Sequence, residues 1–135
     1  MPFSLDLHQW SDLALLVLRC AVAAIFWVHG RSKAGMWKMQ PGPQMPAGML
    51  NLMRTLSIAE PLGALAMLAG FLSQFAAVGF ILVMCGAIYM KRKAWKTPFM
   101  SQTSTGWELD LLVLAASFAL LIIGPGAYSL QALLG

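Results

Sequence analysis

The stretch GWELDLLVLAASFALLIIGPGAYSL, residues 106–130, decides the fold of this 135-residue chain. After Glu108 and Asp110 it is almost pure hydrocarbon until the Gly-Pro-Gly of residues 124–126. A helix that crosses a bilayer needs roughly 17–25 mostly apolar residues, and Gly followed by Pro is a common helix stop. We therefore predict a transmembrane helix over residues 107–123.

Three further apolar stretches, at about residues 13–29, 55–72 and 75–90, have the same character. The chain is 59% hydrophobic and 10% charged, whereas soluble domains carry about 25% charged residues. We expect an all-α fold: an integral membrane, antiparallel four-transmembrane-helix bundle that forms a single domain over residues 1–135. Too little chain is left over for a separate soluble domain.

The distribution of charged residues predicts how the chain is oriented in the membrane. The N-terminal tail holds Asp6 and Asp12 and neither Lys nor Arg, whereas the first and third loops are basic. The basic residues are Arg31, Lys33, Lys38 and Arg54 in the first case, and Lys91, Arg92, Lys93 and Lys96 in the second. Since basic loops stay in the cytoplasm, we expect both termini outside. The run at 91–96 then signals topology and attracts anionic lipid, rather than nucleic acid.

The first apolar stretch does not resemble a cleaved signal peptide, because acidic residues precede it and Arg19 interrupts it. Cys20 and Cys85 form neither a CxxC pair nor a zinc pattern, so each is expected to be a small buried apolar residue, although a redox role stays open. With only His8 and His29 available, no metal site is expected, and no flavin site is identified.

The first loop contains Pro41, Pro43 and Pro46, which exclude a regular helix through its middle. We expect it to lie on the bilayer, with a short amphipathic turn near residues 51–55. Pro61 directly follows Glu60, which predicts a kink and a freed backbone carbonyl beside that carboxylate.

Charged side chains within hydrocarbon are rare and mark candidate functional sites. At 100° per residue, Arg19, Phe26, His29 and Lys33 fall within roughly an 80° arc of the first helix. Arg19 needs a partner, and we expect Glu60 to supply it. Glu108 and Asp110 lie about 200° apart on a helix, so they point to different sides. We expect Glu108 to face His29 and Lys33, and Asp110 to cap its helix or to contact the basic loop.

Three interpretations of these charges stay open at this point. They are ion pairs that only fix helix register, a redox or ligand site, and an ion or substrate transport path.

The same residues resemble the DoxX family. LRCAVAAIFWVHGRSK is similar to that family's opening pattern, in Arg19, Phe26, His29, Gly30 and Lys33. EPLGALAMLAGFLSQFAA is similar to its second motif, in Glu60, Gly63, Gly70 and Ser73. The closing pattern matches at Gly106, Glu108, Gly124, Pro125, Gly126, Tyr128 and Ser129. The chain departs from this pattern at two positions, where Ala127 stands in place of the usual Arg and Gln131 in place of the usual acidic residue. Any ion pair that the usual Arg and acidic residue make is therefore missing.

The resemblance implies a four-helix inner-membrane protein in a redox context, since namesakes of the family are linked to thiosulfate:quinone oxidoreductases. We therefore hypothesise a membrane subunit of a quinone-linked redox system, with a pocket between helices one, two and four near the cytoplasmic interface. His29, Glu60 and Glu108 would be catalytic. The ligand-binding residues would be Arg19, Lys33, Phe26, Trp107 and Asp110.

Quinone is the expected ligand, and the expected partners are the lipid bilayer and a soluble redox enzyme on the cytoplasmic side. Association into a homo-oligomer stays open, and no nucleic acid is expected. One alternative is a non-catalytic anchor or assembly factor for a soluble oxidoreductase. Another is a small multidrug-type transporter, although that class has a carboxylate in its first helix where this chain has Arg19.

Overall fold

Four long helices make up most of the computed structural model, which describes residues 5–135. They are α1 (Ser11–Ser32), α2 (Ala47–Ala69), α3 (Ser73–Tyr89) and α4 (Trp107–Ile123). The short elements are the 3-10 turns η1 (His8–Trp10) and η2 (Ala34–Lys38), the π-helical turn η3 (Met90–Ala94), and α5 (Leu130–Leu134). The described residues contain no strand beyond an isolated bridge between Gly42 and Met45.

The predicted all-α architecture is confirmed. Three segments are long and apolar enough to cross a membrane: His8–Lys38, Ala47–Ala69 and Ser73–Ala94. The fourth helix, α4, has the predicted bounds and 17 residues, which is the lower end of the spanning range. Its crossing of the membrane stays a prediction.

The first loop is shorter than the sequence suggested. Helix α2 begins at Ala47, directly after Pro46, so the expected turn near residues 51–55 is already helical. The three prolines of the loop stay outside any helix. Pro61 lies inside α2, which continues through it to Ala69.

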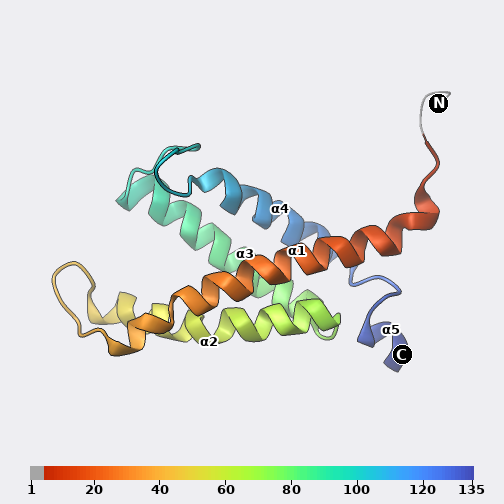
Figure 1. Ribbon diagram of the computed structural model, residues 1–135, viewed down its shortest axis with the longest axis horizontal. Coiled ribbons are helices and arrows are strands. Elements are labelled where there is room, and N and C mark those ends of the chain that lie inside the picture. The colour runs from red at the N-terminus through yellow and green to blue at the C-terminus, as the bar shows by residue number, and fades with distance from the viewer. Residues whose placement is uncertain (1–4) are drawn as a thin grey trace.

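The helices form two pairs. α1 packs mainly on α2, and α3 mainly on α4. The pairs meet where α2 turns into α3, and they run apart toward the opposite end of the molecule (Figure 1). We call the region of the Gly70–Leu72 turn and residues 124–129 the closed end. The end that carries Lys33 and Lys91 is the open end.

A buried arginine ties the closed end together. The Nε and Nη2 atoms of Arg19 donate hydrogen bonds to the carbonyl oxygens of Met67 (3.1 Å) and Leu68 (3.0 Å), and Nη1 donates to the carbonyl of Pro125. Met67 and Leu68 belong to the last turn of α2, whose carbonyls lack the usual partner four residues on and carry the negative end of the helix dipole; the Met67 carbonyl also accepts the N–H of Gly70. The expected Arg19–Glu60 pair is therefore wrong, because backbone carbonyls satisfy the guanidinium.

Further polar contacts close the same end. The Gln74 amide of α3 donates to the carbonyl of Leu121 in α4 (2.7 Å), and Asp12 of α1 accepts the backbone N–H of Ala127 (2.8 Å). Gly70 ends α2 with a left-handed backbone, φ 68°. A side chain at Gly70 would also overlap Ser129 and press on the guanidinium of Arg19, so glycine is needed there.

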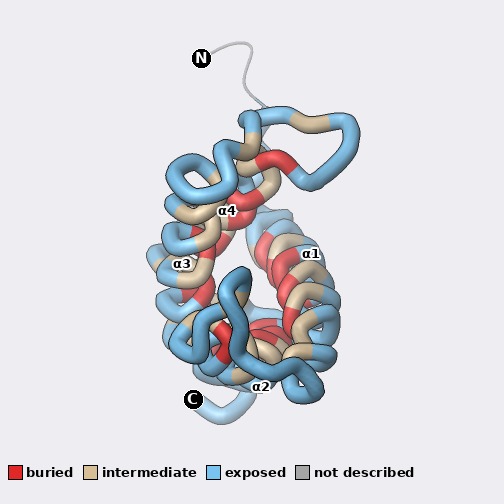
Figure 2. The backbone as a smooth tube through the Cα atoms, turned by 90° about the vertical axis from the view of Figure 1, so that its left-hand side faces the viewer, coloured by how far each residue is buried: buried red, intermediate tan, exposed pale blue. Residues whose placement is uncertain are grey.

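An aromatic layer joins the two helix pairs midway. Phe26 of α1 stacks on Phe80 of α3, with ring centroids 3.6 Å apart. Phe80 also lies against Gly63 of α2, where a Cβ would be only 2.8 Å from the ring. Buried residues face inward between the helices, and the exposed residues cover the outside (Figure 2).

Close approach of α1 and α2 depends on a second glycine. A Cβ at Gly30 would overlap the ring of Pro61 and come within 3.1 Å of Glu60 Cβ. The Pro61 ring is rigid and cannot move aside within a helix. Gly30 thus sets the distance between the two helices one turn from Lys33.

Replacing Arg19 tests the clamp at the closed end. Arg19→Lys keeps the charge but cannot reach three carbonyls, so we expect it to destabilise the protein in detergent by about 2–4 kcal/mol. Because Arg19 and Glu60 do not touch, the effects of Arg19→Lys and Glu60→Gln should add to within about 0.5 kcal/mol. A larger coupling energy in that double-mutant cycle would restore the direct pair.

Gly30→Ala tests the helix approach. We expect it to lower the free energy of unfolding by about 1–3 kcal/mol through overpacking against Pro61. The matched control is Gly86→Ala in α3, where a Cβ meets nothing within 4 Å and the change should be neutral or stabilising. Equal effects of the two substitutions on thermal unfolding in detergent would contradict the packing argument.

Candidate functional site

A large cavity lies where the two helix pairs separate, with a volume of about 910 Å³. Pockets for drug-sized ligands span roughly 300–1,000 Å³. Residues of α2 and α3 supply most of its lining, and α1 and α4 contribute polar side chains. The ionisable residues of the lining are His29, Lys33, Glu60, Lys91 and Asp110. We call this cavity the pocket.

An ion pair joins α1 to α2 on one side of the pocket. Lys33 Nζ, directly after α1, lies 2.7 Å from Oε2 of Glu60, and it also donates to the backbone carbonyl of His29 (3.3 Å). The Glu60 side chain is 1% exposed. Such a buried carboxylate needs a cation close by, and the approach of the helices at Gly30 makes the contact short.

A second ion pair lies on the opposite side. Lys91 Nζ is 2.7 Å from Oδ2 of Asp110, whose side chain is 2% exposed. Lys91 belongs to η3, the π-helical turn that follows α3, and Asp110 lies in the first turn of α4. The contact joins those two helices at the open end. The expected contact between Asp110 and the basic loop is confirmed, and Asp110 does not cap its helix.

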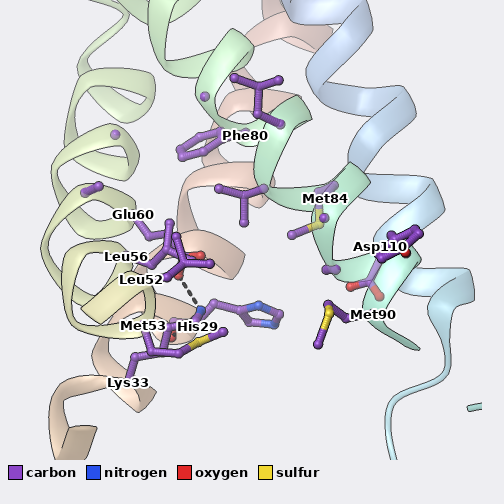
Figure 3. Close-up of a pocket in the computed structure, with 18 of the residues that line it drawn as sticks. His29, Lys33, Leu52, Met53, Leu56, Glu60, Phe80, Met84, Met90 and Asp110 are labelled. Atoms are coloured by element: carbon purple, nitrogen blue, oxygen red, sulfur yellow. Dashed lines mark hydrogen bonds and ion pairs between the residues drawn. The ribbon is translucent and has the colours of Figure 1, made fainter. Parts of the chain in front are cut away.

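His29 lies between the two ion pairs. Its imidazole extends from α1 into the pocket, with Lys33 and Glu60 on one side and Asp110 on the other (Figure 3). The side chain is partly buried, and the carboxylates of Glu60 in α2 and Asp110 in α4 line the same pocket. Imidazole can both donate and accept a proton near neutral pH, so this placement gives the pocket one group suited to acid–base chemistry.

The rest of the lining is apolar and rich in sulfur and aromatic rings. Four methionines line it, Met49, Met53, Met84 and Met90, together with the aromatic residues Phe75, Phe80, Tyr89 and Trp95. Leu52 of α2 and Leu82 of α3 also line it and are 50% and 68% exposed on the outer surface. The pocket therefore opens sideways between α2 and α3, onto the apolar outside of the helices.

Half of the sequence-predicted site residues meet at the pocket. His29, Lys33, Glu60 and Asp110 line it. Phe26 is one layer behind, against Phe80, and Arg19 lies at the closed end.

Glu108 and Trp107 lie outside the lining. Glu108 makes no ion pair within residues 5–135, so the expectation that it faces His29 and Lys33 is wrong. Trp107 instead packs edge-on against Phe99 and under Arg92. The helix rotation that points Asp110 inward turns Glu108, about 200° away, to another side.

Sequence reasoning missed two contributions. It expected Asp110 to contact the basic loop but did not name Lys91 as a residue of the site, although Lys91 follows an apolar stretch at the level where Asp110 begins the next one. It also gave α3 no part in the site, whereas α3 forms a wall of the pocket. The methionines of the lining could not be identified as pocket residues from the sequence, because nothing there distinguishes them from other hydrophobic residues.

Cys20 and Cys85 are free and exposed, so the expectation that they are buried is wrong. Within residues 5–135, no group of three or more His, Cys, Asp or Glu side chains is placed to hold a metal ion.

Comparison with known proteins gives one result. Neither the curated proteins nor the solved structures contain a match to this chain. The family model described as DoxX matches residues 14–92, more than half of the chain, and that range includes His29, Lys33, Glu60 and Lys91. Together with its long apolar helices, this match identifies the chain as a membrane protein of the DoxX family.

Proposed function

We propose that the protein binds the headgroup of a quinone in the pocket and exchanges protons with it, as the membrane subunit of a redox system. One observation carries the proposal: an apolar cavity of about 910 Å³ opens onto the lipid-facing surface and holds one histidine between two ion pairs. A quinone is apolar, resides in the bilayer and takes up two protons with two electrons. The redox context of the family agrees with this ligand.

The residues of the chain have distinct tasks in this proposal. His29 donates or accepts the proton at one ring oxygen, because its side chain alone among those of the pocket titrates near neutral pH when unperturbed. Lys33 and Lys91 stabilise negative charge that develops on the reduced ring. Glu60 and Asp110 hold the two ammonium groups in place. Electrons come from a soluble redox partner or a small reduced donor.

Arg19 has no place in this chemistry. Its three donor groups are already bonded to carbonyls at the closed end. Its contribution is to hold the helices that form the pocket.

An anchoring role for a soluble oxidoreductase is the second candidate. The observation that favours it is the exposure of Arg92, Lys93 and Lys96 at the open end, beside the loop that leads to α4. These cations can attract an acidic protein surface as well as anionic lipid. Both functions can coexist in one subunit.

We further propose that α4 is a fourth crossing and that the open end faces the cytoplasm of an inner membrane. Lys33 and Lys91 are held in ion pairs, yet Arg31, Lys38, Arg92 and others remain as exposed cations at that end. The excess of basic residues favours the cytoplasmic side.

Cysteine labelling tests this orientation. A cysteine introduced at Lys93, in a variant without Cys20 and Cys85, should resist an impermeant maleimide in intact cells and react after lysis. A cysteine at Gln131 should be labelled in intact cells. The reverse pattern would overturn the assignment of the open end to the cytoplasm.

Replacing His29 tests the chemistry. His29→Gln keeps hydrogen-bonding capacity but cannot transfer a proton, so we expect protein-dependent quinone reduction to fall by about 100-fold or more. The measurement is quinone reduction in membranes that contain the protein, with membranes lacking it as the blank. The control is His8→Gln, an exposed histidine outside the pocket, which should retain the full rate.

Full activity of His29→Gln at every pH would remove the proton-transfer role and leave the anchor function.

A further inference from the structure

The two buried carboxylates of the pocket have unused capacity to accept hydrogen bonds. Oε1 of Glu60 has no hydrogen-bond partner within residues 5–135. Oδ2 of Asp110 is close to Lys91 Nζ, but it receives no well-aligned hydrogen bond from any described residue. A buried acceptor without a donor is costly, so both oxygens would gain from a ligand that donates.

The two ammonium groups of the pocket are already in use. Lys33 Nζ donates to Glu60 Oε2 and to the carbonyl of His29. Lys91 Nζ pairs with Asp110 and donates, at 3.4 Å, to the carbonyl of Gly106. A ligand that only accepts hydrogen bonds finds the imidazole of His29 and must otherwise compete for these ammonium groups, whereas a ligand that donates can satisfy Glu60 Oε1 and Asp110 Oδ2.

The charge of the pocket indicates a neutral ligand. Each ion pair combines one ammonium with one carboxylate, so the four groups sum to zero. A permanent cation or anion would therefore enter apolar surroundings without a free counter-charge, which is unfavourable.

The apolar lining indicates that the ligand contains an aromatic ring. Methionine sulfur makes favourable contacts with aromatic rings, and the flexible side chain adapts to their shape. Met84 and Met90 lie beside Asp110, and Met53 lies near Lys33, so sulfur atoms flank the space between the two carboxylates (Figure 3).

From these observations we propose that the pocket selects the reduced form of its ligand: a neutral aromatic diol, a quinol, whose two hydroxyls donate to Glu60 and Asp110. A quinone has two ring oxygens that only accept, and so it lacks the matching groups. This inference rests on the proposed function, because it names the redox state that the same pocket prefers. The step is binding alone, with no bond broken and no electron moved.

Three probes separate donation from ring shape. Decylubiquinol carries two hydroxyl donors, decylubiquinone carries none, and the dimethyl ether of the quinol keeps the reduced ring but also has no donor. Binding of each to the full chain in nanodiscs is measured without oxygen, through the fluorescence of Trp95 in the pocket lining and by equilibrium competition. We expect the quinol to bind at least about tenfold more tightly than either other probe.

Tenfold tighter binding of the quinol raises the midpoint potential of the bound two-electron couple by about 30 mV relative to the free couple. A redox titration in nanodiscs gives this shift independently of the fluorescence measurement.

Two variants assign the preference to named atoms. Glu60→Gln replaces the free carboxylate oxygen by an amide that can also donate, so it should weaken quinol binding and strengthen quinone binding. Asp110→Asn should do the same from the other side of the pocket. The matched control is Glu108→Gln, since Glu108 is in the same turn of α4 as Asp110 but outside the lining. It should leave all three affinities unchanged.

Equal affinities of the normal protein for quinol and quinone would overturn this inference while leaving the proposed function intact. Equal affinities for quinol and its dimethyl ether would also overturn it, because the ring rather than the donors would then be selected. If none of the three probes binds, the proposed function itself fails. If Glu60→Gln does not fold, Asp110→Asn alone decides the assignment.

Discussion

The structure depends on the way in which one guanidinium is satisfied in apolar surroundings. Arg19 reaches two carbonyls at the end of α2 and one after α4, and so it connects both helix pairs at one point. An arginine inside a membrane protein cannot stay without partners, since an unpaired charge there is very costly. Because these partners are backbone atoms at helix ends, their positions are fixed. The closed end is therefore held by a polar contact that requires no second charged side chain.

The open end follows the opposite arrangement. Each helix pair neutralises its own charges: Lys33 pairs with Glu60 between α1 and α2, and Lys91 pairs with Asp110 between η3 and α4. No ion pair crosses from one helix pair to the other within residues 5–135, so electrostatic attraction does not draw the pairs together there. The stacked rings of Phe26 and Phe80 join the two pairs without any charge. A pocket that is neutral as a whole, yet lined by four charged groups, results from this division.

Hydrophobic runs and helix stops were enough to predict the four long helices, and the bounds of α4 agree with the prediction. Spacing also identified His29, Lys33, Glu60 and Asp110 as candidates, because few charged residues interrupt the apolar stretches. Pairing could not be predicted in the same way. The sequence rule that a buried cation needs an anion pointed from Arg19 to Glu60, whereas backbone carbonyls at a helix end serve equally well. Which of Glu108 and Asp110 points into the pocket depends on the rotation of α4 about its axis, and tertiary packing sets that rotation. Lys91 reaches Asp110 from a π-helical turn, which residue spacing does not reveal.

The sideways opening of the pocket, beside Leu52 and Leu82, determines which parts of a ligand contribute to its binding free energy. A ligand that enters from the bilayer moves its hydrocarbon tail from one apolar medium to another, so the tail contributes little to the binding free energy. Each methylene of the tail contributes about 0.8 kcal/mol when it leaves water. That free energy is gained when the ligand partitions into the membrane, before it enters the pocket. Discrimination among lipids with similar tails must then come from the few polar atoms around the headgroup. The relevant concentration is the mole fraction of ligand in the bilayer, and weak intrinsic binding is sufficient to fill the pocket.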